Sequence, residues 1–327
     1  MSDSPSPTHD PPLVSLDAVR EAADRLAPHI ARTPLLTNRS ISQMAGRPVY
    51  MKGEHLQRTG SFKARGALNA LLAGGAREQA GVVTVSAGNH AQAVAWAAAQ
   101  VGLSATVVMP RSAPAVKVAA SRSYGAHVRL VETVQEAFRE ALRLAELENR
   151  FLLHPFDDPH VIAGQGTVGL ELHHEMPEEV VELYVPVGGG GLIAGVAAAL
   201  SALRPALRIF GVEPRGAAAM TAGVKAGTPI TLERLSTVAD GLAAPMAGRI
   251  PLKHVQSQVK GIQLVEDASI FQAMSLLLTR SKAVVEPAGA AGVAALLDLS
   301  HNESSAPAAT ILCGGNVDPS LLARLPF

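Results

Sequence analysis

The 327-residue sequence contains a single cysteine, Cys313. One cysteine excludes an intramolecular disulfide and any zinc site built from several thiolates. Aromatic residues make up only 3% of the chain, which argues against a surface that stacks nucleic-acid bases. Neither sign of charge is in excess, because 28 Lys and Arg balance 28 Asp and Glu. The chain therefore lacks the basic field that attracts nucleic acid.

Long hydrophobic runs are also missing. The alanine-rich stretches at 91–99 and 191–203 are too short, or too interrupted by glycine, to span a bilayer. Residues 1–14 are rich in Ser, Pro and Asp, lack the apolar core of a signal peptide, and are expected to form a disordered tail. The remaining sequence, with 48% hydrophobic and 17% charged residues overall, is typical of a globular protein, and we expect it to be cytoplasmic.

Short β-branched segments alternate with helical patterns along most of the chain. Strands are predicted at 48–52, 81–86, 105–109, 126–131, 151–154, 183–187, 208–213 and 309–313. Helices are predicted at 16–27, 64–72, 91–101, 114–124, 134–149, 167–176, 192–203, 267–280 and 289–297. This alternation predicts an α/β fold with parallel sheets and right-handed crossovers. The pattern is weakest between 215 and 262, where no element is assigned.

Lys63 has unusual neighbours for a lysine. It follows Gly60, Ser61 and Phe62 and directly precedes the alanine-rich helix at 64–72. An ammonium held against apolar surface loses hydration, so its pKa falls and the free amine becomes available to form a Schiff base. The alternative interpretation is an ordinary lysine at a helix start, with its stem packed and its head in solvent.

Four consecutive glycines, Gly188–Gly191, separate a predicted strand from a predicted helix. Glycines at this position leave backbone amides open at the positive end of the helix, which is an arrangement that binds phosphate. The loop also fits a dinucleotide pattern, with Gly189, Gly191 and Ala194, and Glu213 ends the next strand. A dinucleotide-binding oxidoreductase is therefore an alternative, as is a tight turn in which glycine only relieves crowding.

Two further loops follow predicted strands, at the end where ligand sites of parallel sheets lie. Residues 86–90 read SAGNH and residues 313–316 read CGGN, while Glu286 stands just before a predicted helix. Asn89 and the amides of its loop could hold an oxyanion. Taken singly, each feature also has an ordinary explanation: helix capping by Asn89, a buried Cys313 acting as a small hydrophobe, and a solvated Glu286.

Together, and in this order, these segments resemble the threonine/serine dehydratase and serine racemase family, within the pyridoxal-phosphate enzymes of the tryptophan-synthase β type. The resemblance runs from about residue 16 to the end and rests on 61–67 (SFKARGA), 86–90 (SAGNH), 164–167 (GQGT), 188–191 (GGGG), 286–289 (EPAG) and 313–316 (CGGN). It implies two three-layer α/β/α domains, the smaller inserted in the larger. We therefore expect a large cofactor-binding domain at 15–75 and 158–327, and a small domain at 76–157.

The resemblance also implies the site. Lys63 would bind pyridoxal 5'-phosphate as a Schiff base and later move the α-proton. The implied cofactor-binding residues are Phe62, Lys63, Asn89, Gly188, Gly189, Gly190, Gly191, Leu192, Glu286 and Cys313. The implied substrate-binding residues are Ser86, Ala87, Asn89 and His90. Some relatives bind a divalent cation through a carboxylate like Glu213 and a second acid, but residues 216–219 here contain no acid, so no metal site is expected.

The implied activity is β-elimination from L-threonine, L-serine or both, which gives 2-oxobutanoate or pyruvate plus ammonia. Serine racemase and 3-hydroxyaspartate dehydratase are alternatives, because the sequence does not rank the substrate side chains. Ala87 stands where racemases of the family have a serine, which favours elimination. The expected partners are a small-molecule substrate and further copies of the chain in a homodimer or larger homo-oligomer, with no nucleic acid and no membrane.

Overall fold

The computed structural model describes residues 11–75, 78–298 and 305–326. Residues 1–10 of the expected tail lie outside the described residues. The strands are β1 (Leu35–Thr37), β2 (Val49–Lys52), β3 (Val82–Val85), β4 (Ala105–Pro110), β5 (His127–Val131), β6 (Phe151–Leu152), β7 (Glu182–Pro186), β8 (Arg208–Pro214), β9 (Gly261–Val265) and β10 (Ala308–Ile311). Thirteen α-helices accompany them within the described residues, and none of these helices has both the length and the apolar character needed to cross a membrane.

The helices lie mostly where the sequence predicts them. Their bounds are α1 (Leu16–Leu26), α2 (Arg39–Met44), α3 (Lys63–Ala73), α4 (Asn89–Val101), α5 (Ala115–Ser123), α6 (Val134–Leu147), α7 (Pro159–Glu175), α8 (Gly191–Leu203), α9 (Ala219–Ala226), α10 (Arg249–Gln258), α11 (Asp267–Ser281), α12 (Pro287–Asp298) and α13 (Pro319–Leu322). Short 3-10 helices include η2 (Arg58–Gly60) and η5 (Asp240–Leu242).

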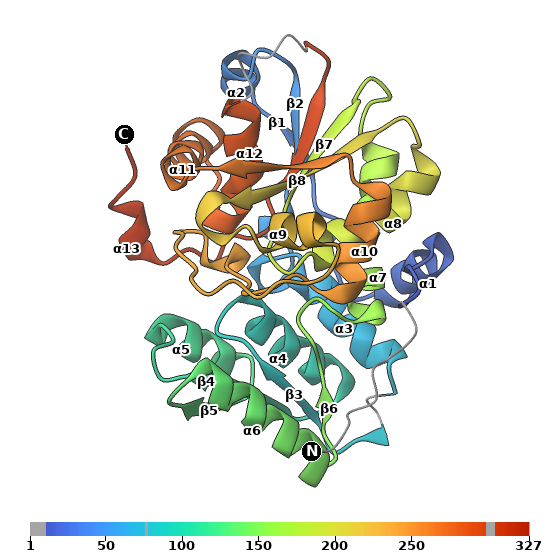
Figure 1. Ribbon diagram of the computed structural model, residues 1–327, viewed down its shortest axis with the longest axis vertical. Coiled ribbons are helices and arrows are strands. Elements are labelled where there is room, and N and C mark those ends of the chain that lie inside the picture. Colours follow the sequence, from blue (N-terminus) through green and yellow to red (C-terminus); the bar gives the residue numbers. More distant parts are fainter. Residues whose placement is uncertain (1–10, 76–77, 299–304, 327) are drawn as a thin grey trace.

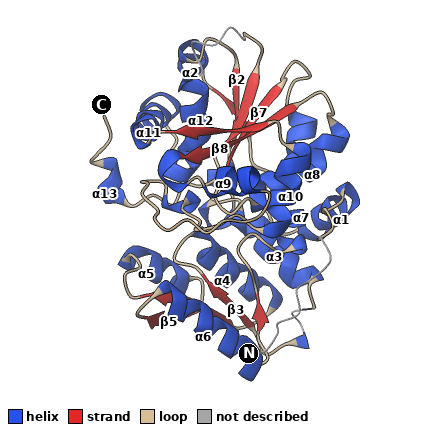
Figure 2. Ribbon diagram, in the orientation of Figure 1, coloured by secondary structure: helices blue, strands red, loops and turns tan. Residues whose placement is uncertain are grey.

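The larger sheet has six strands in the order β1-β2-β10-β7-β8-β9 (Figures 1 and 2). All neighbours are parallel except β1, which runs antiparallel to β2. Every residue of β7 and β10 is buried, because α12 packs against both strands and α8 also packs against β7. Such cover is typical of parallel strands and explains why most residues of both strands are apolar.

The smaller sheet has four parallel strands in the order β5-β4-β3-β6. All four strands lie between residues 82 and 152, whereas the larger sheet takes its strands from before and after that segment. Figure 1 shows the smaller sheet, with α4, α5 and α6, below the larger one. The chain therefore leaves the larger sheet after β2 and returns to it at β7. The expected domain limits at 76 and 157 remain a prediction, and residues 76–77 lie outside the described residues.

Helix α7 begins at Pro159, eight residues earlier than predicted, so the prediction of a helix start at Thr167 is wrong. Asp158 caps the true start, because its side chain accepts a hydrogen bond from the Val161 amide at 2.8 Å. The glycines at 164 and 166 lie inside the helix and do not end it. Packing against neighbouring helices outweighs the low helix propensity of glycine at these positions.

Those glycines let three helices touch. A Cβ at Gly164 would lie 2.7 Å from the Arg65 carbonyl oxygen of α3, and one at Gly166 would lie 2.8 Å from the Gly195 carbonyl oxygen of α8. Helix α7 is therefore held between α3 and α8 by backbone-to-backbone contact. Since α3 starts at Lys63 and α8 starts in the glycine turn, this packing fixes the spacing of the two helix starts.

A buried cluster of ion pairs, formed through Arg65, also holds α3 in place. Arg65 is fully buried and donates to both oxygens of Glu54, at 2.8 and 2.7 Å, and to Glu171 at 2.7 Å. Lys52, also fully buried, contacts Glu171 at 2.7 Å and Glu175 at 2.6 Å. Each buried charge thus has an opposite charge within hydrogen-bond distance, which offsets much of the cost of removing it from water.

The segment between 215 and 262, left unassigned from the sequence, contains α9, α10 and the start of β9. Both helices begin with help from distant carboxylates. Glu213 is buried and accepts from the Met220 amide at 2.7 Å and the Thr221 amide at 2.9 Å, at the start of α9. Asp157 accepts from two amides at the start of α10. Because these caps come from outside the helices, no local pattern in the sequence reveals them.

The glycine contacts predict a position-specific effect of alanine. In Gly195→Ala the new Cβ would lie 2.5 Å from the Gly166 nitrogen, and we expect a loss of about 1–3 kcal/mol of unfolding free energy from overpacking. Gly223→Ala is the matched control, because its Cβ would meet Leu252 at an ordinary 3.4 Å, and alanine should be neutral or stabilise α9 by up to about 1 kcal/mol. Chemical denaturation of both variants measures the difference. Equal stabilities would contradict the close contact of α7 and α8.

Candidate active site

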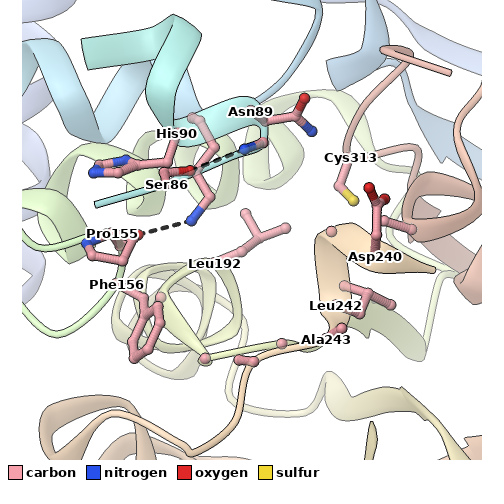
Figure 3. A pocket seen from close by; sticks show the side chains of 18 of the residues that line it. Ser86, Asn89, His90, Pro155, Phe156, Leu192, Asp240, Leu242, Ala243 and Cys313 are labelled. Atoms are coloured by element: carbon pink, nitrogen blue, oxygen red, sulfur yellow. Dashed lines mark hydrogen bonds between the residues drawn. The ribbon is translucent and has the colours of Figure 1, made fainter. Parts of the chain in front are cut away.

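A cavity of about 330 Å³ is formed by loops that follow strands of both sheets (Figure 3). Every residue that the sequence predicts for the site lines it: Phe62, Lys63, Ser86, Ala87, Asn89, His90, Gly188, Gly189, Gly190, Gly191, Leu192, Glu286 and Cys313. Figure 3 shows Ser86, Asn89 and His90 along one side and Asp240, Leu242 and Ala243 across from them. The structure thus brings the predicted residues together, while their roles remain a prediction.

Lys63 is the first residue of α3, and its Nζ donates a hydrogen bond to the Pro155 carbonyl oxygen at 2.8 Å. The same nitrogen lies 5.2 Å from the centre of the Phe62 ring. Burial lowers the pKa of Lys63 to about 8, although the nearby Cys313 opposes this shift. About a tenth of the amine is therefore unprotonated at pH 7, far more than for an ordinary lysine, and the free amine is the state that attacks an aldehyde.

The chain before Lys63 is held by the loop after β10. Thr59 and Gly60 both have positive φ, at 59° and 72°, and Asn316 Nδ2 donates to the Thr59 carbonyl oxygen at 2.7 Å. Ser61 pairs with Gly314 as a single antiparallel bridge. A threonine in the left-handed region is unfavourable on its own and persists only when surrounding contacts fix it. These contacts therefore determine where α3, and with it the amine, begins.

The glycine turn forms the opposite end of the cavity, between β7 and α8. Gly190 has φ of 94°, which favours glycine. A Cβ at Gly188 would lie 3.1 Å from the Leu242 Cα, and one at Gly191 would lie 3.1 Å from the Phe156 Cα. The turn is thus enclosed by two other segments and presents its amides, rather than side chains, to the cavity. Helix α8 starts there, so its positive end faces the same space.

Asn89 begins α4 and joins the two halves of the cavity. Its Nδ2 donates to Glu286 Oε1 at 2.6 Å, and its Oδ1 accepts from Asn316 Nδ2 at 2.8 Å. Burial raises the pKa of Glu286 to about 7, and the charge of Asp240 raises it further, whereas the bond from Asn89 lowers it. A side-chain amide has two hydrogens, so Asn89 keeps one donor for a ligand.

The loop at 86–90 presents few charges. Ser86 Oγ accepts from the Gly88 amide at 3.2 Å, and a Cβ at Gly88 would meet nothing within 4 Å. Burial lowers the pKa of His90 well below its ordinary value, and the Lys63 charge adds to the shift. His90 is therefore neutral at pH 7. Its Nδ1 is a buried atom without a hydrogen-bond partner among the described residues.

Cys313 lies just after β10 and is 3% exposed. Burial raises the pKa of its thiol well above the ordinary value, and the charge of Glu286 raises it further. The sulfur is therefore a neutral thiol, which donates or accepts only weak hydrogen bonds. Cys313 therefore adds no negative charge to the cavity.

This donor set fits the group that the resemblance implies. Pyridoxal 5'-phosphate carries an aldehyde, a phosphate and a pyridine nitrogen. The Lys63 amine suits the aldehyde, the Gly188–Gly191 amides suit the phosphate, and the neutral Cys313 suits an unprotonated pyridine nitrogen. A Cβ at Gly189 or Gly190 would lie within 2.4 Å of Phe156 or Met220, so a larger residue at either position would displace the turn.

Several lining residues were not identified from the sequence. They are Gly88, Pro114, Lys117, Pro155, Phe156, Pro186, Asp240, Gly241, Leu242, Ala243, Ala244 and Ala288. Pro155 and Phe156 follow β6, so their place after a parallel strand is a signal that could have found them. Residues 240–244 lie in the segment without periodicity, and there the sequence offers no comparable signal.

Metal binding has little support in the geometry. Among the described residues, no three His, Cys, Asp or Glu side chains gather into a group that could hold a metal ion. Glu213, the carboxylate considered for a cation, is engaged with the start of α9 and also accepts from Thr221 Oγ1 at 2.6 Å.

The pKa of Lys63 predicts how its reactivity depends on pH. In protein stripped of cofactor, labelling of Lys63 by trinitrobenzenesulfonate should rise with a midpoint near pH 8, because only the free amine reacts. By linkage, unfolding free energy should also rise with pH between about 8 and 10.5, since the unfolded chain binds the extra proton there. Mass spectrometry of the peptide that contains Lys63 measures the labelling. A midpoint close to 10.5 would refute the desolvated amine.

Known proteins resemble the chain over nearly its whole length. The family model described as "Pyridoxal-phosphate dependent enzyme" matches residues 26–314. An L-threonine ammonia-lyase of Thermotoga maritima is 40% identical over 96% of this chain and 78% of its own length. A catabolic L-threonine dehydratase of Escherichia coli is 38% identical over 97% of both chains.

A solved structure agrees with these sequence matches. The structure of maize serine racemase superposes with a TM-score of 0.91 at 39% identity, over 96% of this chain and 97% of that one. This likeness confirms the predicted α/β fold of the tryptophan-synthase β type, and the family match rules against the dinucleotide-binding alternative. The cofactor is accordingly pyridoxal phosphate, and the chain belongs to the family of pyridoxal-phosphate dependent enzymes.

Proposed function

We propose that the protein is an ammonia-lyase that removes water and ammonia from L-threonine, L-serine or both. The observation that carries the proposal is the partly buried Lys63 amine, with its pKa lowered to about 8, in one cavity with an anion-binding glycine turn and the 86–90 loop. The dehydratases and ammonia-lyases among the relatives support the same reaction class.

The bound cofactor and Lys63 have different roles in the proposed elimination. Bound pyridoxal phosphate supplies an electron-withdrawing ring that acidifies the α-proton of a substrate joined to it. Lys63 Nζ takes that proton, because a free amine near neutral pH is a competent base. The bond between the β-carbon and the hydroxyl oxygen would then break with its electron pair on oxygen, and the proton that Lys63 took would return to that oxygen, so that water leaves. Hydrolysis of the released dehydrated amino acid gives a 2-oxo acid and ammonia.

The 86–90 loop would hold the substrate carboxylate. Its members supply amides at the start of α4 and the Ser86 hydroxyl, and His90 lines the same part of the cavity. Backbone amides at a helix start attract an anion without adding a titratable group to the site. A carboxylate held here would face the Lys63 amine from the smaller-sheet side of the cavity.

We also propose the finer features of the molecule that the sequence suggests. Residues 76–157 would form the smaller domain, supported by the place of the four-stranded sheet in the chain. A cytoplasmic location is supported by the single, buried cysteine, and a homodimer or larger homo-oligomer by the family resemblance.

Serine racemase is the second candidate, because a serine racemase is among the structures with the highest likeness. Racemisation needs a proton donor on each face of the planar carbanion, and Lys63 serves one face only. Ala87 lies in the 86–90 loop, where a serine would add the second donor, and its methyl group carries no exchangeable proton. Elimination is therefore favoured over racemisation.

Lys63→Ala tests the proposed catalyst. We expect loss of the visible absorbance of the bound cofactor and a fall in 2-oxo acid release of at least about 10³-fold, because both the attachment and the base are removed. Lys260→Ala, at an exposed lysine outside the cavity, is the control and should retain turnover. A thermal melt of each variant checks folding. Normal turnover by Lys63→Ala would disprove the assignment.

Ala87→Ser tests the choice between elimination and racemisation. The wild type, given L-serine, should release pyruvate in large excess over D-serine. The added hydroxyl should raise the ratio of D-serine to pyruvate by about tenfold, because it can return a proton to the second face. Chiral chromatography and a pyruvate assay measure both products. Comparable rates of D-serine and pyruvate formation by the wild type would favour the racemase instead.

A further inference from the structure

One ion pair in the cavity has no part in the mechanism above. Lys117, on α5 beside the smaller sheet, pairs through Nζ with Asp240 Oδ2 in η5. The Lys117 side chain is 15% exposed and that of Asp240 is 57% exposed, so the pair lies where the cavity reaches solvent. Both residues line the cavity, as does Pro114 just before α5.

Other charged groups lie near this ion pair and shift one another's pKa values. Among described residues that line the cavity, the charged types are Lys63, Lys117, Asp240 and Glu286, with His90 neutral. Asp240 raises the pKa of buried Glu286 and Lys117 lowers it, so both lie close to that carboxyl. The pKa of Asp318 is lowered by its hydrogen bonds from Ser320 and, to a lesser degree, by Lys117. Lys117 is thus faced by acids from several elements.

The remaining wall determines which substrate side chain fits. Once the residues for the cofactor and the substrate carboxylate are set aside, the cavity is lined by small and apolar groups, Pro114, Pro155, Leu242, Ala243, Ala244 and Ala288 among them, and by the ion pair. Apart from Lys63, Lys117 is the only cation among the described residues of the lining. A second carboxylate on a substrate would have no other positive partner there.

We propose that the Lys117–Asp240 pair determines substrate specificity, by admitting hydroxy amino acids with uncharged side chains and rejecting those with a second carboxylate. The inference rests on the proposed function and selects among its substrates. Lys117 is the group that could receive a second carboxylate, but Asp240 already occupies it and repels the same anion. Acidic substrates such as 3-hydroxyaspartate are therefore excluded by a carboxylate of the protein, not by lack of a cation.

The cost of admitting an acidic substrate follows from this arrangement. Such a substrate would have to separate Lys117 from Asp240 and leave the Asp240 carboxylate beside the incoming one. Like charges placed together at a binding site are a common way to reject the wrong ligand. The cost disappears if Asp240 loses its charge while Lys117 is kept.

The test compares two four-carbon probes, succinate with two carboxylates and butyrate with one, bound to the holoenzyme and measured by calorimetry. Wild type should prefer butyrate. Asp240→Asn removes the repelling charge with little change of shape and frees Lys117, so the affinity ratio of succinate to butyrate should rise by about tenfold or more. The ratio of kcat/KM for 3-hydroxyaspartate to that for L-threonine should rise in parallel.

Lys117→Gln is the matched control, because it removes the cation and leaves Asp240. Its succinate-to-butyrate ratio should stay at or below the wild-type value. If the ion pair serves only to hold the two sides of the cavity together, both variants should bind both probes more weakly and to the same degree. The succinate-to-butyrate affinity ratio would then be unchanged, and this result would overturn the proposal. It is equally overturned if Asp240→Asn binds no succinate at concentrations that saturate it with butyrate, or if no variant binds either probe.

Failure of the proposed function has a different signature. In that case the wild type releases no 2-oxo acid from L-threonine or L-serine, whatever the binding ratios are. Thermal melts check that each variant is folded, and Asp240→Asn should melt like the wild type because Asp240 is exposed.

Discussion

The direct contact of helices α3, α7 and α8 through glycine is the constraint on which the site depends. Gly164 and Gly166 lie on α7 and remove the side chains that would separate it from its neighbours. Because α3 begins with Lys63 and α8 begins in the glycine turn, the packing of the helices sets the distance between the amine and the turn that would hold the aldehyde and the phosphate of the cofactor. A methyl group at either glycine would change that distance before it touched the cavity.

Burial then sets the charges inside this frame. The same removal from water that lowers the pKa of Lys63 raises those of Cys313 and Glu286 and keeps His90 neutral. The result is a free amine among groups that carry little charge. Outside the cavity, the charges of Arg65 and its partners are fully paired, so they anchor α3 without supplying a rival base. Local composition and burial together therefore make one amine reactive.

Much of this could be predicted from the sequence, and the exceptions have physical causes. Strand-and-helix alternation located most elements, and loops after parallel strands located the lining residues, because topology brings such loops to one place. The start of α7 differs from the prediction because glycine has low helix propensity, whereas the close contacts of Gly164 and Gly166 with neighbouring helices require glycine there. Residues 240–244 were missed because their position depends on contacts with distant segments, such as the Leu242 backbone against Gly188, and not on local periodicity.

The six residues between β6 and α7 have a further consequence, which depends on four of them. Pro155 accepts the bond from Lys63, Phe156 packs on the glycine turn, and Asp157 and Asp158 cap α10 and α7. A short segment thus connects the smaller sheet to the cofactor site, and each of these four residues contacts a different neighbouring element. Any rotation of the smaller sheet would therefore displace the Lys63 amine and the glycine turn together. Access to the cavity and the reactivity of Lys63 would change at the same time.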